Sequence, residues 1–209
     1  ELLKIDKKTK KSVLLNPFQY FPDNIILNFE DNLSFLYIGS FYNKRKPDKL
    51  IEAFIRFLRV NPNAELNFVG VGNNTTVLEA AKKYHQINVQ SWTDEPEKFM
   101  TINSVLIDLS ADIPADVFIG SKLNNYFMYN KPILSISPID SPTRVMLKDC
   151  KNSVFFSDWS VDSIYTSILA INSTNFKSSI FEERNALRLE LNIQQITDKL
   201  ISNLNKISV

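Results

Sequence analysis

The sequence has few of the residues that build crosslinked, metal-binding or membrane-spanning proteins. Its one cysteine, Cys150, excludes a disulfide framework and a cysteine-based zinc site. Its one histidine, His85, excludes a histidine-rich metal site or proton relay. No apolar run approaches the ~18 residues that a membrane-spanning helix needs. These absences together predict a soluble protein of a reducing compartment.

Neither sign of charge dominates the chain, because 24 lysines and arginines stand against 23 aspartates and glutamates. The net charge of +1 excludes a disordered acidic or basic chain and gives no overall attraction to nucleic acid. The 209 residues, 44% of them hydrophobic, suffice for one large α/β domain. The chain begins with Glu1, and no apolar signal segment follows, so we expect a piece of a longer polypeptide.

Apolar strands and amphipathic helices alternate along most of the chain. Leu33–Ile38 is an apolar run that ends in Gly39, as a buried parallel strand does, and Pro47-Asp48 then opens a helix. The unit recurs without a hairpin signal, which predicts a Rossmann-like α/β fold, a doubly wound parallel sheet of about six strands. We expect further strands at 66–69, 87–90, 105–109, 132–136 and 153–156, helices between them, and two closing helices near 180–190 and 193–207.

Ligands of such sheets bind beyond the carboxyl ends of the strands, so the loops there are the candidate site. The first of these loops carries Gly39, Ser40 and three consecutive cations, Lys44, Arg45 and Lys46. An arginine can bind a diphosphate through two parallel hydrogen bonds. A solvated basic turn is the competing interpretation.

The second loop, Gly70-Val71-Gly72, precedes a helix. Thr75 stands where a dinucleotide-binding fingerprint needs glycine, so the motif is weak evidence for a cofactor. Glycine would still let the backbone approach a ligand, and the amides at the helix start attract anions. A tight strand-to-helix turn explains the same residues.

A third loop contains Asp112 and Asp116 and leads to a helix starting near Ser121. We expect Ser121 to cap this helix, and Lys122 in its first turn opposes the helix dipole, which favours an anion nearby. The two aspartates could bind a metal, although two carboxylates without further ligands are weak evidence for one.

Several segments match, in order, a pattern found in one enzyme family. They are Tyr37–Ser40 with Pro47–Phe54, Leu66–Gly72 with its Val-Gly-x-Gly turn, and Ser121–Leu134 with its Lys-Leu…Lys-Pro-Ile pattern. The chain thereby resembles the carboxyl-terminal, nucleotide-sugar-binding domain of retaining family 4 glycosyltransferases of GT-B fold. Asn16-Pro17 resembles the exit from the amino-terminal domain of these enzymes.

The resemblance implies an enzyme of two domains. Residues 1–30 would be the interdomain linker and the end of a missing amino-terminal domain, and residues 31–209 the donor-binding domain. Arg45, flanked by Lys44 and Lys46, would hold the diphosphate, and Trp92-Thr93 would lie beside the nucleobase. The implied donor-binding residues are Gly39, Ser40, Lys44, Arg45, Lys46, Gly70, Gly72, Trp92, Thr93, Ser121, Lys122 and Asn125.

The sequence departs from the family pattern at four positions. Ser40 stands in place of an arginine, Asn130 stands in place of a glycine, and the two family glutamates correspond to Val117 and Asn125. We expect Asn125 to contact the ribose hydroxyls, and Asp112 or Asp116 to supply the carboxylate that is lost.

The resemblance also implies a reaction. A hexosyl unit would pass from a UDP-sugar to a lipid-linked saccharide in bacterial surface polysaccharide (O-antigen or capsule) synthesis, without a metal or other cofactor. The acceptor would bind through the missing amino-terminal domain, so this chain would be inactive alone; no nucleic acid would take part. We expect a cytoplasmic protein with peripheral contact with the inner membrane. A GT-B nucleotide-sugar epimerase domain and a non-catalytic α/β interaction domain remain as alternatives.

Overall fold

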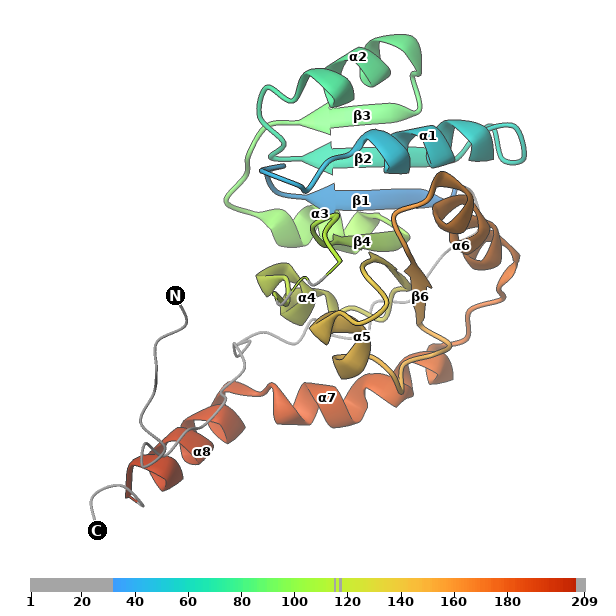
Figure 1. Cartoon of the computed structure of the whole chain (residues 1–209). Helices are drawn as coiled ribbons and strands as arrows, with labels where there is room; N and C mark the ends of the chain where they lie inside the picture. The colour runs from blue at the N-terminus through green and yellow to red at the C-terminus, as the bar shows by residue number, and fades with distance from the viewer. Residues whose placement is uncertain (1–31, 115, 117, 206–209) are drawn as a thin grey trace.

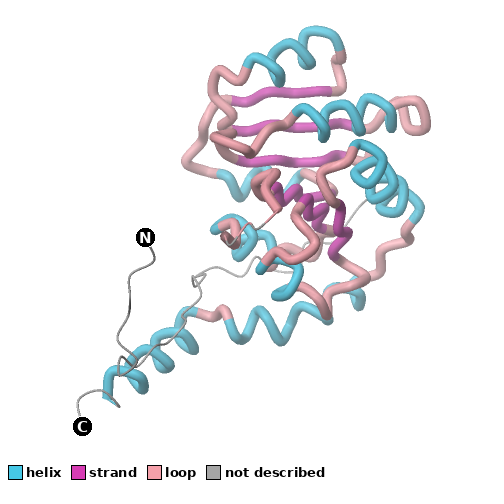
Figure 2. Tube along the Cα trace, in the orientation of Figure 1, coloured by secondary structure: helices cyan, strands magenta, loops and turns pink. Residues whose placement is uncertain are grey.

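The computed structural model describes residues 32–114, 116 and 118–205. Within them, six strands form one parallel sheet in the order β3-β2-β1-β4-β5-β6, with helices on both faces (Figure 1, Figure 2). The predicted doubly wound fold is confirmed, whereas the expected linker, residues 1–30, lies outside the described residues. The strands are β1 (Ser34–Ile38), β2 (Glu65–Val69), β3 (Ile87–Gln90), β4 (Val105–Leu109), β5 (Ile133–Ile136) and β6 (Val154–Ser157).

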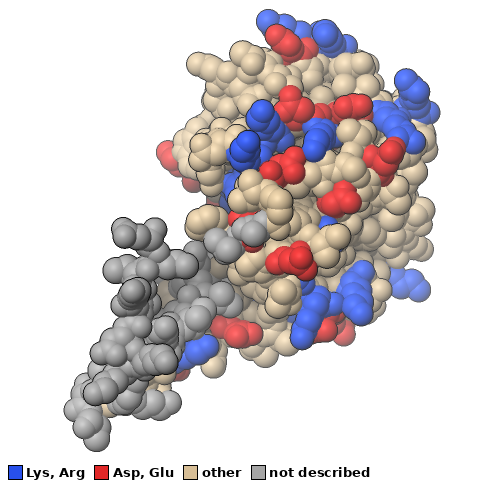
Figure 3. Space-filling model, viewed as in Figure 1, with Lys and Arg blue, Asp and Glu red and all other residues tan. Residues whose placement is uncertain are grey.

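The helices follow the strands as the alternating pattern predicts. They are α1 (Asp48–Phe57), α2 (Thr75–Lys83), α3 (Pro96–Ile102), α4 (Ser121–Tyr126), α5 (Pro142–Met146), α6 (Val161–Ser173), the 3₁₀ helix η1 (Ser178–Arg184), α7 (Asn185–Glu190) and α8 (Ile193–Asn205). Within the described ranges, none of these helices is both long and apolar enough to cross a membrane. Basic and acidic side chains are interspersed over the face drawn in Figure 3.

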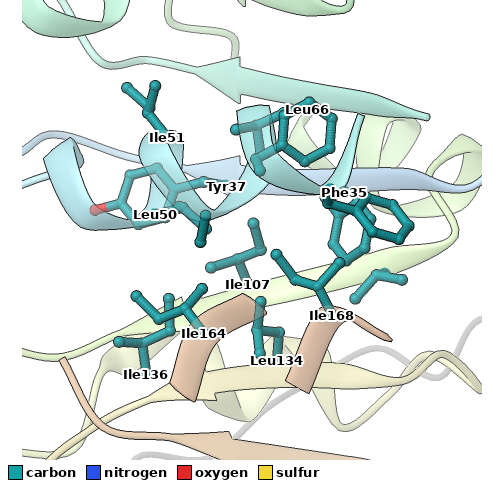
Figure 4. Close-up of a cluster of buried hydrophobic side chains, with 14 of the residues drawn as sticks. Phe35, Tyr37, Leu50, Ile51, Leu66, Ile107, Leu134, Ile136, Ile164 and Ile168 are labelled. Carbon is teal, nitrogen blue, oxygen red and sulfur yellow. The ribbon is translucent and has the colours of Figure 1, made fainter. Parts of the chain in front are cut away.

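Side chains of β1 alternate between the two faces of the sheet, because successive residues of a strand point in opposite directions. Phe35 and Tyr37 belong to the core cluster formed with α1 and α6 (Figure 4). Leu36 and Ile38 belong to a second cluster, which includes Leu123 of α4. Both faces of the sheet are therefore covered, as a parallel sheet requires.

The segment from η1 to α7 is attached to the sheet through a buried arginine. The Arg184 side chain is fully buried, and it donates hydrogen bonds to the Tyr129 carbonyl (3.1 Å), the Ser153 carbonyl (2.6 Å) and the Ser153 hydroxyl (2.9 Å). The Glu183 carboxylate accepts hydrogen bonds from the Ser153 amide and hydroxyl. These contacts connect the carboxyl-terminal part of the chain to the residue that precedes β6.

Candidate functional site

A cavity of about 730 Å³ lies at the carboxyl ends of the central strands. The strand order reverses between β1 and β4, and ligands of parallel sheets bind at such a switch point. The volume is in the range of small-molecule sites, roughly 300–1,000 Å³. The expected residues Gly39, Ser40, Lys44, Arg45, Trp92, Asp116, Ser121 and Lys122 are among those that line it, whereas Lys46, Gly70, Gly72, Thr93, Asp112 and Asn125 are not.

Lys122 lies over Gly39, just beyond the end of β1, and lines the cavity. Its ammonium lies 4.6 Å from the centre of the Tyr37 ring. A β-carbon built on Gly39 would lie 2.3 Å from this ammonium, and the φ of Gly39 is +116°, so the lysine needs glycine beneath it. Burial, together with the nearby Arg45 charge, lowers the pKa of Lys122 to about 8, although Asp108 acts in the opposite direction.

Arg45 is another cation of the cavity and is partly buried. Tyr42 holds it, because the guanidinium donates to the Tyr42 hydroxyl (3.1 Å) and lies 4.9 Å from the centre of that ring. The Nε of Arg45 is buried without a hydrogen-bond partner. Among the described residues, neither Arg45 nor Lys122 forms an ion pair. Arg45 and Lys122 are therefore partly buried cations of the cavity that form no ion pair with a carboxylate of this part of the chain, whereas Lys44, which also lines the cavity, is exposed.

Asp108, which the sequence interpretation treated only as part of a strand, is a cavity carboxylate whose charge acts on Lys122. It is buried near the carboxyl end of β4, and its Oδ2 accepts a hydrogen bond from the Ser135 hydroxyl (3.1 Å). Burial raises the pKa of Asp108 to about 6, while Ser135, Arg45 and Lys122 act to lower it. The sequence signal was a single carboxylate inside an otherwise apolar strand.

Asp112 and Asp116, either of which was expected to supply the lost carboxylate, both have partners within the protein. Asp116 accepts hydrogen bonds from the amides of Ala111 and Phe118, both at 3.1 Å, and so stabilises the loop. Asp112 forms an exposed ion pair with Lys49 (2.9 Å). In the described part of the chain, no three side chains of metal-binding type are clustered.

The remaining expected residues lie at the edge of the cavity or outside it. Asn125 is exposed on α4, outside the cavity lining. Gly70 lies under Trp92, since a β-carbon built there would lie 2.8 Å from the indole ring. The Thr93 hydroxyl accepts a hydrogen bond from the Glu95 amide (3.0 Å).

Ser121 is the first residue of α4 rather than its cap. Gly120 occupies the capping position and has no side chain to accept a hydrogen bond. The prediction that Ser121 caps α4 is therefore wrong, because a cap precedes the helix and α4 already includes Ser121.

Comparison with known proteins gives no family from sequence. No protein-family model matches the chain, and no curated protein sequence matches it significantly. Solved structures do match its fold. A TarM variant from S. aureus, in a complex that contains UDP, matches with a TM-score of 0.64 and 13% identity over 91% of this chain and 37% of TarM.

Two further structures extend this likeness. A UDP-forming α,α-trehalose-phosphate synthase from Burkholderia xenovorans has a TM-score of 0.66 and 8% identity over 86% of this chain and 46% of its own. A Listeria monocytogenes protein assigned as a UDP-N-acetylglucosamine 2-epimerase has a TM-score of 0.52 and 15% identity over 74% of this chain and 40% of its own. The chain thus spans less than half the length of each neighbour. At such low identity the likeness shows the fold alone. That fold is the Rossmann-like α/β fold with a parallel sheet, which a part of each of these enzymes shares.

Proposed function

We propose that this chain is the domain of a glycosyltransferase that binds the UDP-sugar donor. One observation carries the proposal: Arg45 and Lys122 line one cavity at the switch point of the sheet without a carboxylate ion partner in the described residues. Two cations close together in a partly buried site match the charge of a diphosphate. The UDP in the TarM complex and the UDP-forming activity of the synthase support this choice of ligand.

The proposed chemistry of this domain is electrostatic. Transfer of the sugar breaks the bond between the anomeric carbon and the diphosphate, so negative charge grows on the departing UDP. Arg45 and Lys122 would stabilise that charge in the transition state, which is the contribution that raises the rate. Tyr42 holds the guanidinium and Gly39 admits the lysine, so both cations are positioned before the donor binds.

The finer assignment rests on the sequence resemblance. We propose a retaining enzyme of family 4 type that moves a hexosyl unit to a lipid-linked saccharide in bacterial surface polysaccharide synthesis. The acceptor would bind to a part of the enzyme outside this chain. The enzyme would work at the cytoplasmic side of the inner membrane and require no metal.

The likeness to the Listeria protein favours one second candidate, a nucleotide-sugar epimerase. Its catalytic histidine would have to come from outside this chain, because His85 is exposed and does not line the cavity. An epimerase needs no acceptor. Conversion of UDP-N-acetylglucosamine to its 2-epimer by the full-length parent, without any saccharide acceptor, would favour the epimerase over the transferase.

Replacing Arg45 with alanine tests the proposed function directly. We expect the Kd of UDP to rise about tenfold or more, because a charged hydrogen bond contributes about 1.5–3 kcal/mol. Uridine lacks the diphosphate, so its binding should change little. Isothermal titration calorimetry with both ligands measures the difference. Arg59→Ala is the control, since Arg59 is an exposed arginine outside the cavity lining. Equal losses for both ligands would remove Arg45 from the diphosphate site, and no UDP binding by the unmodified chain would favour a non-catalytic interaction domain.

The pH dependence of UDP binding should follow the protonation of Lys122. Because the pKa of Lys122 is lowered to about 8, the side chain is a cation at neutral pH and loses its proton as the pH rises through that value. An anionic ligand favours the protonated form, so the affinity should fall between about pH 7 and pH 9. The pKa of Asp108, raised to about 6, lies below this window. Lys122→Met should bind UDP more weakly and with a flat profile there; a variant profile as steep as that of the unmodified chain would assign the titration to another group.

A further inference from the structure

The cavity has three chemically different parts that follow the strand order of the sheet. Trp92 lies on Gly70 at the end of β2, and Lys122 lies over Gly39 at the end of β1. Asp108 is at the end of β4, on the other side of β1. From β2 to β4 is two strand spacings, roughly 10 Å. The cavity thus has an aromatic surface at β2, a cation at β1 and a carboxylate at β4, in that order across the sheet.

A nucleotide sugar has its three parts in a matching order, with the base and the sugar on opposite sides of the diphosphate. If the diphosphate lies at Lys122 and Arg45, and the base lies toward Trp92, the sugar must lie toward β4. The side chain it meets there is Asp108, which lines the cavity.

One oxygen of Asp108 remains available to a ligand. Its Oδ2 accepts the hydrogen bond from Ser135, while no described residue donates to Oδ1. Gly120 lies beside Oδ1, and a β-carbon built on it would be only 3.1 Å from that oxygen. The absence of a side chain at Gly120 therefore leaves space next to an unused acceptor. The other cavity carboxylate, Asp116, already has a hydrogen bond on each oxygen.

We propose that Asp108 binds a hydroxyl group of the donor's sugar through Oδ1 and so selects a hydroxyl-bearing sugar nucleotide. This inference rests on the proposed function and adds the residue that recognises the sugar of the donor. Ser135 orients the carboxylate by its hydrogen bond to Oδ2. A buried acceptor discriminates strongly, because a sugar without the matching hydroxyl would leave it unpaired in the complex.

The test compares UDP with UDP-glucose on the same variants of the chain. Asp108→Asn keeps the size of the side chain and removes its charge. We expect the ratio of the Kd of UDP-glucose to the Kd of UDP to rise about tenfold. UDP alone should bind as well as before or more tightly, because a negative charge near the diphosphate is gone. Asp162→Asn makes the same chemical change on α6, outside the cavity lining, and the ratio should stay constant.

Ser135→Ala provides an independent variant. It leaves the Asp108 charge in place but removes the hydrogen bond that orients it, so the ratio should rise by a smaller factor in the same direction. An unchanged ratio in both Asp108→Asn and Ser135→Ala would overturn the assignment of Asp108, and so would failure of the unmodified chain to bind UDP-glucose while it binds UDP. Failure to bind UDP at all would instead overturn the proposed function.

Discussion

Replacing Arg184 with alanine should lower the free energy of unfolding by about 3–5 kcal/mol. The buried guanidinium donates three hydrogen bonds, to the carbonyls of Tyr129 and Ser153 and to the Ser153 hydroxyl. Alanine would remove all three hydrogen bonds from the protein interior and would create a cavity where the long side chain lay. Urea unfolding followed by circular dichroism measures the difference.

The matched control for this variant is Arg59→Ala. Arg59 is an exposed arginine just beyond α1, so its removal should change the unfolding free energy by no more than about 0.5 kcal/mol. A loss below about 1 kcal/mol in Arg184→Ala would mean that water or a rearranged side chain replaces the three hydrogen bonds.

Replacing Gly39 with alanine should weaken UDP binding about tenfold or more. The new β-carbon would lie 2.3 Å from the Lys122 ammonium and 2.7 Å from its Cε, so the lysine must leave its place over the Tyr37 ring. The substitution should also lower the stability of the fold, because a φ of +116° is unfavourable for alanine by about 1–3 kcal/mol. Calorimetry with UDP and a thermal unfolding curve separate the two effects.

Gly72→Ala is the control, because it strains the backbone at a positive φ but brings no β-carbon against another side chain. Gly72 has a φ of +60°, and no atom lies within 4 Å of a β-carbon built on it. The variant should lose some stability and keep its UDP affinity. If Gly39→Ala binds UDP as tightly as Gly72→Ala does, Lys122 does not hold the diphosphate from its position over Gly39.

The fold was predictable because its strands are marked locally. Each buried strand is a short apolar run, and the helix after it has one apolar face, as in α1 with Leu50, Ile51, Phe54 and Phe57. The attachment of η1 through Arg184 was not predictable in this way. Arg184 and Ser153 are 31 residues apart in the chain, and no periodicity of the sequence reports a hydrogen bond between them.

The candidate site was predictable where it follows from the topology of the sheet. Gly39, Arg45 and Lys122 lie in loops or at a helix start beyond the strands, where the rule for parallel sheets places ligands. Asp108 was missed because the site was sought only in the loops beyond the strands, whereas Asp108 lies within β4 as the one carboxylate of an otherwise apolar strand. The ribose contact of Asn125 stays a prediction; α4 buries Leu123 and Tyr126 and leaves Asn125 exposed.

The position of Trp92 against Gly70 has a practical consequence. The chain contains two tryptophans, and they lie in opposite environments: Trp92 is 68% exposed at the cavity, whereas Trp159 is 7% exposed and belongs to the core. A dissolved quencher such as iodide reaches the first indole and not the second. The intrinsic fluorescence of the protein therefore contains two separable signals, one for occupancy of the cavity and one for integrity of the fold, and needs no attached dye.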